Sequence, residues 1–246
     1  MIAALLVVEI SLLDGSGSHG DRFAVARQHA SGPVAGPYHT APAAQPASTS
    51  APKQPPRGAF LLGRVRTTLH TRVGTVRPQT SFGDDTWLLI LRHHGNRGIA
   101  LVPTTGEPRP AAVNLAKLQL RWTRVRITIN LARLRLDVRR GRHLLGTFPI
   151  AAGTPATPTP TGRFSVTDRI VFPHGGTYGT FALALSAHQT HLVPGWTGGD
   201  QVAIHGTDHP DTIGTYASLG CIRVSESALR VLRRAVPLGA PVRIRA

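Results

Sequence analysis

The second half of the chain alternates apolar and polar residues with the two-residue period of a β-strand that buries one face. Apolar side chains occupy every second position from 125 to 131 and again from 134 to 138, and arginine, threonine and asparagine fill most positions between them. Arg140 and Gly141 predict a turn. The next run, HLLGTFPIAAG at 143–153, predicts another strand, so residues 124–153 are expected to form a meander.

After this meander, repeated proline and glycine interrupt the strand pattern. The stretch TPATPTPTGRFSV at 154–166 predicts a fixed loop, which we expect to shape a rim, and then a strand that starts at Phe164. Helical spacing occurs only near the end, where Ser225 or Ser227 can cap a helix that Pro237 stops. The closing run APVRIRA predicts a last strand. The expected fold is therefore mainly β, with one helix after the cysteine.

Residues 58–120 are also expected to form short strands. Apolar runs at 59–70, 86–95 and 97–103 are separated by glycine, proline and aspartate turn signals. A segment of about sixty residues is close to the lower limit for an independent hydrophobic core. The strand spacing resembles that of small bacterial barrels of the Src-homology-3 kind, so we expect a small all-β module here. The pattern does not indicate what this module does.

The N-terminal residues lack this pattern. Residues 31–57 are rich in proline, alanine, serine and threonine and almost empty of large apolar side chains, which predicts an extended linker. Before it, the residues from Ile2 to Val8 are apolar, but Glu9 interrupts them and the run is too short to span a bilayer. Residues 1–30 are therefore expected to be either the remnant of an export signal or a disordered tail.

The charge of the chain is strongly positive. Its 246 residues include 28 lysines and arginines against 12 aspartates and glutamates, a formal net charge of +16 that calls for an anionic partner or a strongly charged environment. The arginines are spread over predicted strands rather than gathered in a tract that would follow a phosphate backbone. We therefore expect no nucleic acid partner, and anionic cell-wall polymers stay open as partners. High arginine beside much alanine, glycine and proline can also reflect genomic base composition.

The single cysteine, Cys221, lies in the stretch SLGCIRV at 218–224, so a disulfide within the chain is excluded. A thiol becomes a nucleophile as the thiolate, which requires a base or a positive environment. The run QVAIHG places His205 at the end of a predicted strand, and a loop leads from there to Gly220 and Cys221 before the helix. This order fits a cysteine–histidine dyad. A buried, inert cysteine is the alternative.

Three motifs in this order, TPTGRF, IHGT and SLGCIRV, resemble the catalytic domain of the L,D-transpeptidases, the YkuD family. The resemblance implies a β-sandwich catalytic domain over residues 122–246 and a cysteine acyl-enzyme mechanism that needs no metal or organic cofactor. Under this resemblance Cys221 is the nucleophile and His205 is the base that takes its proton. The carbonyl of Gly206 would orient the imidazole.

The resemblance also implies roles for residues around the nucleophile. The amides of Gly220 and Cys221 would form an oxyanion hole, since a glycine lets the backbone pass close to a substrate. Ser218 fits the Ser/Thr position of the motif, where we expect it to hydrogen-bond, and we place it with the substrate-binding residues. Arg223 either anchors the catalytic loop or contacts a substrate carboxylate. Tyr178 either lines the rim of the pocket or packs.

One position departs from the family pattern, and several alternatives stay open. Many members have a second histidine directly before the Gly-Cys pair, where this chain has Leu219. Because the base maps to His205, we expect the change to affect the acyl acceptor and not activation of the thiol. A non-catalytic wall-binding protein of the same fold and an L,D-carboxypeptidase with water as acceptor are alternatives. A metal site from His188, His191, His205 and His209 is another, although no tight ligand spacing supports it.

The resemblance implies a substrate and a compartment. The donor would be a peptidoglycan stem tetrapeptide, cleaved between its third residue and the terminal D-alanine. An amine of a second stem would then resolve the acyl-enzyme as a 3→3 cross-link. A carbapenem is expected to inhibit covalently, because the thiolate would attack its strained carbonyl in the same way. This chemistry implies an extracytoplasmic location, in the cell wall or a periplasm-like space.

Overall fold

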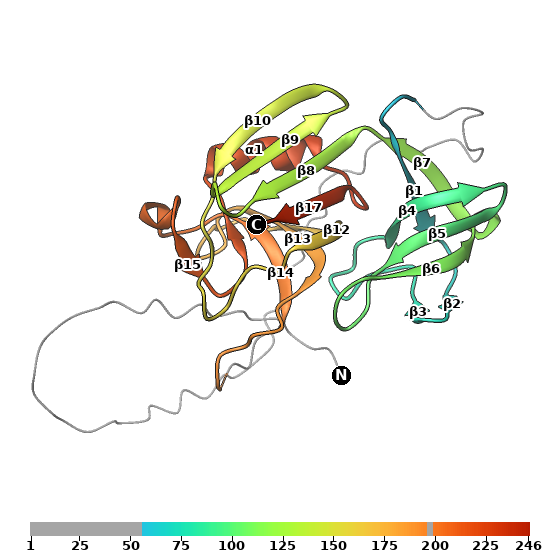
Figure 1. Cartoon of the computed structure of the whole chain (residues 1–246), viewed down its shortest axis with the longest axis horizontal. Helices are drawn as coiled ribbons and strands as arrows, with labels where there is room; N and C mark the ends of the chain where they lie inside the picture. Colours follow the sequence, from blue (N-terminus) through green and yellow to red (C-terminus); the bar gives the residue numbers. More distant parts are fainter. Residues whose placement is uncertain (1–55, 196–198) are drawn as a thin grey trace, which may run out of the picture.

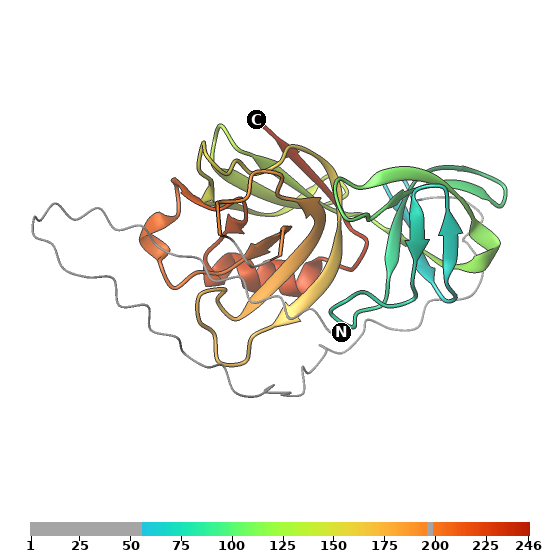
Figure 2. The ribbon, with the colours of Figure 1, turned by 90° about the horizontal axis from the view of Figure 1, so that it is seen from below.

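The computed structural model of the protein describes residues 56–195 and 199–246. The predicted tail at 1–30 and most of the predicted linker, 31–55, lie outside the described residues. The described residues form two β-rich parts that lie side by side in both Figure 1 and Figure 2. The chain passes from one to the other between β7 (Leu118–Thr123) and β8 (Val125–Asn130). No helix among the described residues is long and apolar enough to cross a membrane.

The first part is a five-stranded antiparallel sheet in the order β6-β5-β4-β1-β7. Its other strands are β1 (Phe60–Val65), β4 (Trp87–His94), β5 (Arg97–Val102) and β6 (Arg109–Asn114). A short hairpin of β2 (Leu69–Thr71) and β3 (Gly74–Val76) and a 3-10 turn at Leu115–Lys117 complete it. Since β7 pairs with β1 through Thr123, Trp122 lies in this sheet, whereas the sequence placed it in the second part. The Src-homology-3 resemblance stays a prediction.

The second part contains one eight-stranded sheet in the order β10-β9-β8-β17-β12-β13-β14-β16. Its strands after β8 are β9 (Arg135–Arg140), β10 (His143–Pro149), β12 (Gly162–Val171), β13 (Phe181–His188), β14 (Gln201–His205), β16 (Ile222–Arg223) and β17 (Pro241–Arg245). A separate parallel pair joins β11 (Ala152–Gly153) to β15 (Tyr216–Ser218), and a second 3-10 turn spans Pro210–Thr212. The antiparallel pairing of β8 with β9 and of β9 with β10 confirms the predicted meander.

The eight-stranded sheet curls around a single hydrophobic core. Ile127 from one half of the sheet and Leu183 and Ile204 from the other half belong to the same buried cluster. The two layers of the predicted sandwich are therefore halves of one curled sheet. In β8, the buried residues fall at every second position, as the alternation of the sequence predicts. The fold class is mainly β, as expected.

The α-helix α1 (Glu226–Ala235) closes this core. Leu229 and Leu232 are buried, and the side chain of Ser225 accepts a hydrogen bond from the Ala228 amide at the N-cap. Ser225 is thus the cap of the two predicted candidates. In Figure 1 the helix lies behind β9 and β10. It contacts β10 and β13, which lie in different halves of the curled sheet, so it helps to hold those halves together.

The interface between the two parts contains both apolar and polar contacts. Leu238, which follows α1, packs against the core of the second part and also against a cluster of the first part that includes Leu62 and Trp87. Thr80 donates a hydrogen bond to the buried carboxylate of Asp168 on β12. The Arg169 amide donates to the Asp84 side chain at 2.7 Å. The first part is therefore docked on β12 and not only tethered.

Candidate active site

Two short parallel strands bring His205 and Cys221 to one face of the sheet. β14 pairs with β16, with Ile204 opposite Ile222 and His205 opposite Arg223. Ile204 and Ile222 are both buried in the core. Because successive side chains on a strand point to opposite faces, His205 and Arg223 lie on the other face. Cys221 directly precedes β16 and follows the same alternation.

His205 is fully buried, and its ring has defined neighbours on two sides. Its Nδ1 lies 2.5 Å from the carbonyl oxygen of Gly206. A carbonyl can only accept a hydrogen bond, so Nδ1 carries the proton and the lone pair of the neutral imidazole is on Nε2. The ring of Tyr178 meets the imidazole edge-on, with 4.9 Å between ring centroids. His205 therefore has the tautomer that a base acting through Nε2 requires.

Gly206 is fixed by a close approach of two backbone segments. Its amide donates to the Tyr178 carbonyl at 2.8 Å. A Cβ on Gly206 would lie 2.7 Å from the Cα of Gly179, so a larger residue would push the segments apart. This contact brings Tyr178 against His205, which agrees with the packing alternative for Tyr178. Tyr178 does not line the pocket at the cysteine.

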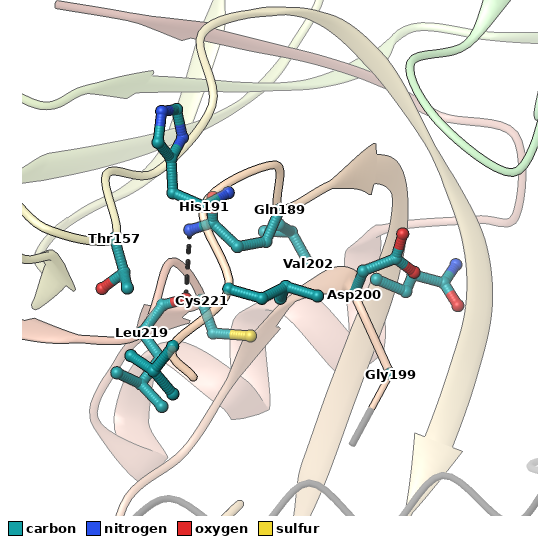
Figure 3. A pocket seen from close by; sticks show the side chains of 11 residues that line it. Thr157, Gln189, His191, Gly199, Asp200, Val202, Leu219 and Cys221 are labelled. Carbon is teal, nitrogen blue, oxygen red and sulfur yellow. Dashed lines mark hydrogen bonds between the residues drawn. The ribbon is translucent and has the colours of Figure 1, made fainter. Parts of the chain in front are cut away.

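Cys221 lies in a pocket beside β13 and β14. Its side chain is partly exposed, and its Sγ accepts a hydrogen bond from the backbone nitrogen of Ala203 at 3.5 Å. Figure 3 shows the thiol among side chains from four segments. With Cys221, the lining residues are Thr157, Gln189, His191, Leu192, Val193, Gly199, Asp200, Gln201, Val202 and Leu219. The buried His205 is not part of this lining.

The segment from Ser218 to Cys221 is fixed by hydrogen bonds of its own. The Ser218 Oγ donates to the Cys221 carbonyl at 2.6 Å and accepts from the Gly220 amide at 3.1 Å. Ser218 thus bonds within the motif as expected. It is fully buried, so its placement among the substrate-binding residues does not agree with the structure. The Gly220 amide is engaged by Ser218, so the oxyanion role predicted for it does not fit this geometry either.

The threonine-rich loop at 154–161 supports the same segment. Thr157 Oγ1 donates to the Ser218 carbonyl at 3.2 Å, and Thr159 Oγ1 donates to the Gly220 carbonyl at 2.9 Å. Gly153 permits this contact, since a Cβ there would lie 2.6 Å from the Thr159 nitrogen. The loop was expected to shape a rim. Thr157 does line the pocket. The loop also holds the backbone of residues 218–221, the nucleophile segment.

Arg223 lies away from the pocket, at the base of the nucleophile segment. Its side chain is buried and its Nη1 donates to Thr212 Oγ1 at 3.3 Å. Its backbone forms two hydrogen bonds with Ala151, both at 3.0 Å. These contacts favour the anchoring role over contact with a substrate carboxylate.

Sequence reasoning missed Gln189, which follows β13 and is almost fully buried. Its side-chain nitrogen donates to the carbonyls of Pro158 and Leu219, both at 3.1 Å. The only available signal was a polar residue two positions after the apolar run FALALSA, and it belongs to no motif. The Leu219 side chain lines the pocket, so the pocket wall is apolar at the position directly before the Gly-Cys pair.

The other histidines proposed as metal ligands have different partners. His188 Nδ1 lies 2.9 Å from an Asp200 oxygen, and His191 Nδ1 lies 3.0 Å from Thr190 Oγ1. His209 is exposed. Within residues 56–195 and 199–246, no three His, Cys, Asp or Glu side chains are grouped so that they could hold a metal ion.

The fold and the site define a mainly β domain in which a histidine ends one strand and a cysteine directly precedes the neighbouring parallel strand. The family model for the YkuD L,D-transpeptidase catalytic domain matches residues 124–244. The YkuD protein of Bacillus licheniformis is 36% identical over 121 residues, and that of Bacillus subtilis strain 168 is 33% identical over 118 residues. Both are named, provisionally, L,D-transpeptidases. The similarity of this chain to the YkuD family of L,D-transpeptidase catalytic domains therefore lies in residues 124–244.

The extent of these matches is limited. They cover 49% and 48% of this chain and 64% of each relative, so the chain aligns with less than two thirds of either protein. Among solved structures, an L,D-transpeptidase from Mycobacterium tuberculosis H37Rv is 16% identical with a TM-score of 0.42, covering 56% of this chain and 70% of that one. The catalytic domain of the E. faecium enzyme is 26% identical with a TM-score of 0.36, covering 49% and 96%. These scores are too low to support a functional conclusion.

Proposed function

We propose that this protein is a peptidoglycan L,D-transpeptidase that uses Cys221 as its nucleophile and His205 as its base. The observation that carries the proposal is the His205 ring, whose Nδ1 is committed to the Gly206 carbonyl on the strand next to Cys221. A proton-accepting Nε2 on the same face as a thiol is what nucleophilic cysteine catalysis needs. The match of residues 124–244 to the YkuD family model supports the same assignment.

The first half of the proposed reaction makes an acyl-enzyme. The imidazole of His205 takes the proton of the Cys221 thiol, and the thiolate attacks the carbonyl carbon of the third stem residue. The Ala203 amide, which donates to the sulfur, favours its negative charge. The bond to the terminal D-alanine then breaks, its nitrogen receives the proton from the imidazolium, and D-alanine leaves. A thioester to Cys221 remains.

The second half transfers the acyl group. An amine of a second stem peptide attacks the thioester, the C–S bond breaks and the thiolate is regenerated. The amine proton passes through His205, and the product is a 3→3 cross-link. Because Leu219 gives the pocket an apolar wall next to Cys221, we expect the acceptor to be bound without a histidine at that position.

The Cys221 amide is the proposed donor to the developing oxyanion. A trans peptide is planar, and its C=O and N–H point in opposite directions. The Gly220 carbonyl points towards Thr159 Oγ1, which donates to it at 2.9 Å, so the Cys221 N–H points to the opposite side of that peptide. An amide of fixed direction can stabilise a negative oxygen in the transition state without reorganising.

The proposal extends to inhibitors, partners and compartment. A carbapenem is the proposed covalent inhibitor, because the thiolate of Cys221 would attack its strained carbonyl as it attacks the stem peptide. The net charge of +16 suits a location outside the cytoplasm among anionic cell-wall polymers. No nucleic acid partner and no cofactor enter the proposed reaction.

Product masses from a defined stem tetrapeptide test this function. The expected products are free D-alanine and a cross-linked dimer, both absent with Cys221→Ala. Free D-alanine with tripeptide and no dimer would replace the transpeptidase by an L,D-carboxypeptidase. No release of D-alanine, together with binding to isolated sacculi that survives Cys221→Ala, would support a wall-binding protein instead.

A further inference from the structure

The side chain of Gln189 connects three segments around the thiol. Its Nε2 donates to the carbonyls of Pro158 and Leu219 at 3.1 Å each, and its Oε1 accepts from the His191 amide at 2.9 Å. Figure 3 shows this side chain beside Cys221, with a hydrogen bond to the nucleophile segment. With 6% of its surface exposed, Gln189 loses most competing hydrogen bonds to water. Its amide is thus committed to these partners.

The bond to Leu219 acts on a single peptide plane. The Leu219 carbonyl and the Gly220 amide belong to the same planar unit, so their directions are coupled. Gln189 Nε2 holds the carbonyl, and Ser218 Oγ holds the amide at 3.1 Å. Both ends of this unit are fixed, and the next unit begins at Gly220 and carries the Cys221 amide.

Gln189 and Gly220 also fit each other sterically. Gly220 has a φ of +116°, and a Cβ on it would lie 2.2 Å from Gln189 Nε2. The absence of a side chain at 220 is what allows the amide of Gln189 to reach the Leu219 carbonyl. The positive φ then turns the chain towards Cys221.

We propose that Gln189 is a positioning residue for the nucleophile, a role that rests on the proposed function of Cys221. By fixing the Leu219–Gly220 peptide, it sets the direction from which the Cys221 thiol and amide face the substrate. Gln189 touches no reacting atom in this role. Its loss should slow formation of the acyl-enzyme much more than it weakens substrate binding, because small errors of position act on the reacting geometry.

Two substitutions separate the contacts of Gln189. Gln189→Met keeps the length of the side chain and its neutrality but removes both donor bonds. Gln189→Glu keeps an acceptor for the His191 amide and turns a carboxylate towards two carbonyl oxygens. When that carboxyl is protonated at low pH, its O–H can donate to the Leu219 carbonyl again. Ser186→Ala is the control for stability, because the fully buried Ser186 Oγ accepts a hydrogen bond from the Ser165 amide at 3.0 Å and Ser186 does not line the pocket at Cys221.

The experiment measures the single-turnover rate of Cys221 acylation by a carbapenem in the full chain, together with unfolding by denaturant. We expect Gln189→Met to acylate roughly 10- to 100-fold more slowly than the parent. Its loss of stability should resemble that of Ser186→Ala, and its apparent affinity for the carbapenem should change little. Relative to Gln189→Met, the rate of Gln189→Glu should recover as the pH falls through the range where a carboxyl protonates.

Acylation of Gln189→Met at the parent rate would overturn the positioning role. A slowdown no larger than the unfolded fraction explains, or one that Ser186→Ala matches, would overturn it as well. If Gln189→Met does not fold, the test uses the acylation rate of Gln189→Glu divided by that of the parent, measured at low and at neutral pH. A ratio that does not change with pH contradicts the positioning role. An unmodified parent protein would instead contradict the proposed function itself.

Discussion

At the residue scale, His205 has the most restricted surroundings in the site. It is fully buried, its Nδ1 is committed to the Gly206 carbonyl and its ring packs against Tyr178. The hydrogen bond from Nδ1 to the Gly206 carbonyl makes Nε2 the nitrogen that can take a proton. A substitution at His205 can therefore test the general base, provided that the replacement keeps the fold.

We expect His205→Gln to keep the fold and to reduce turnover and thiol labelling by about 10²- to 10⁴-fold, the usual contribution of general-base assistance. A glutamine amide can still donate to the Gly206 carbonyl, but it cannot accept the thiol proton. Iodoacetamide labelling rates and tetrapeptide turnover measure the effect. His209→Gln is the matched control, because His209 is exposed four residues later in the chain, and it should be much milder. Turnover at the parent rate in His205→Gln would remove His205 from the mechanism.

At the scale of elements, the segment from β15 to β16 is held by partners that lie far away in the sequence. Thr157 and Thr159 come from the loop after β11, and Gln189 comes from the end of β13. Two glycines of positive φ border or interrupt this segment: Gly214, at +98°, lies two residues before β15, and Gly220, at +116°, lies between β15 and β16. Only Gly220 is also closely packed.

These two glycines provide a matched pair of substitutions. Gly214→Ala and Gly220→Ala should each lose roughly 1–3 kcal/mol of stability, because alanine is strained at positive φ. Only Gly220→Ala should also slow acylation of Cys221 by more than tenfold, since its Cβ displaces Gln189 from the Leu219 carbonyl. Denaturant unfolding and carbapenem acylation rates of both variants measure the two effects. Equal acylation rates in the two variants would show that the contact with Gln189 does not matter.

Local patterns predicted the elements of this fold better than their arrangement. The alternation at Val125, Ile127 and Ile129 identified β8, and the single Cys221 with the motif around it identified the nucleophile candidate. The position of β17 was not predictable, because it inserts between β8 and β12 through long-range pairing. The contact of Gln189 with Leu219 depends in the same way on tertiary packing, so no local pattern announces it.

At the scale of the whole molecule, a buried carboxylate lies at the interface between the two parts. Asp168 on β12 is 1% exposed and accepts a hydrogen bond from Thr80 of the first part. Burial raises the pKa of Asp168 to about 6, although hydrogen bonds from Thr80 and Thr167 oppose the shift. Asp168 is thus protonated in the folded protein at pH values where it is ionised in the unfolded chain.

The raised pKa of Asp168 makes the folded state less stable as the pH rises. Below the ordinary pKa of 3.8, Asp168 is protonated in both states, and its contribution to folding is most favourable there. As pH rises from about 4 to about 6, the unfolded chain loses this proton first, so the folded state is progressively disfavoured. The difference between a pKa of about 6 in the folded protein and 3.8 in the unfolded chain corresponds to about 3 kcal/mol at neutral pH.

We therefore expect Asp168→Asn to be more stable than the parent at pH 7 by up to about 3 kcal/mol, and nearly equal to it at pH 4. Urea unfolding at several pH values measures this difference. Asp137→Asn is the opposite control, since the hydrogen bond from Arg135 lowers the pKa of Asp137, so its removal should cost stability at neutral pH and little at low pH. A pH-independent difference between Asp168→Asn and the parent would contradict the burial argument.

Covalent modification of the native protein by a carbapenem tests the central claim most directly. The account predicts one adduct in the intact-protein mass spectrum, located by digestion to the peptide containing LGCIR and absent in Cys221→Ala, because an activated thiolate with a fixed oxyanion donor attacks the strained carbonyl. An inert structural thiol would give no adduct and would label with iodoacetamide only after unfolding. Native protein that stays unmodified under these conditions, and releases no D-alanine from a tetrapeptide, would contradict the assignment of Cys221 as a catalytic nucleophile.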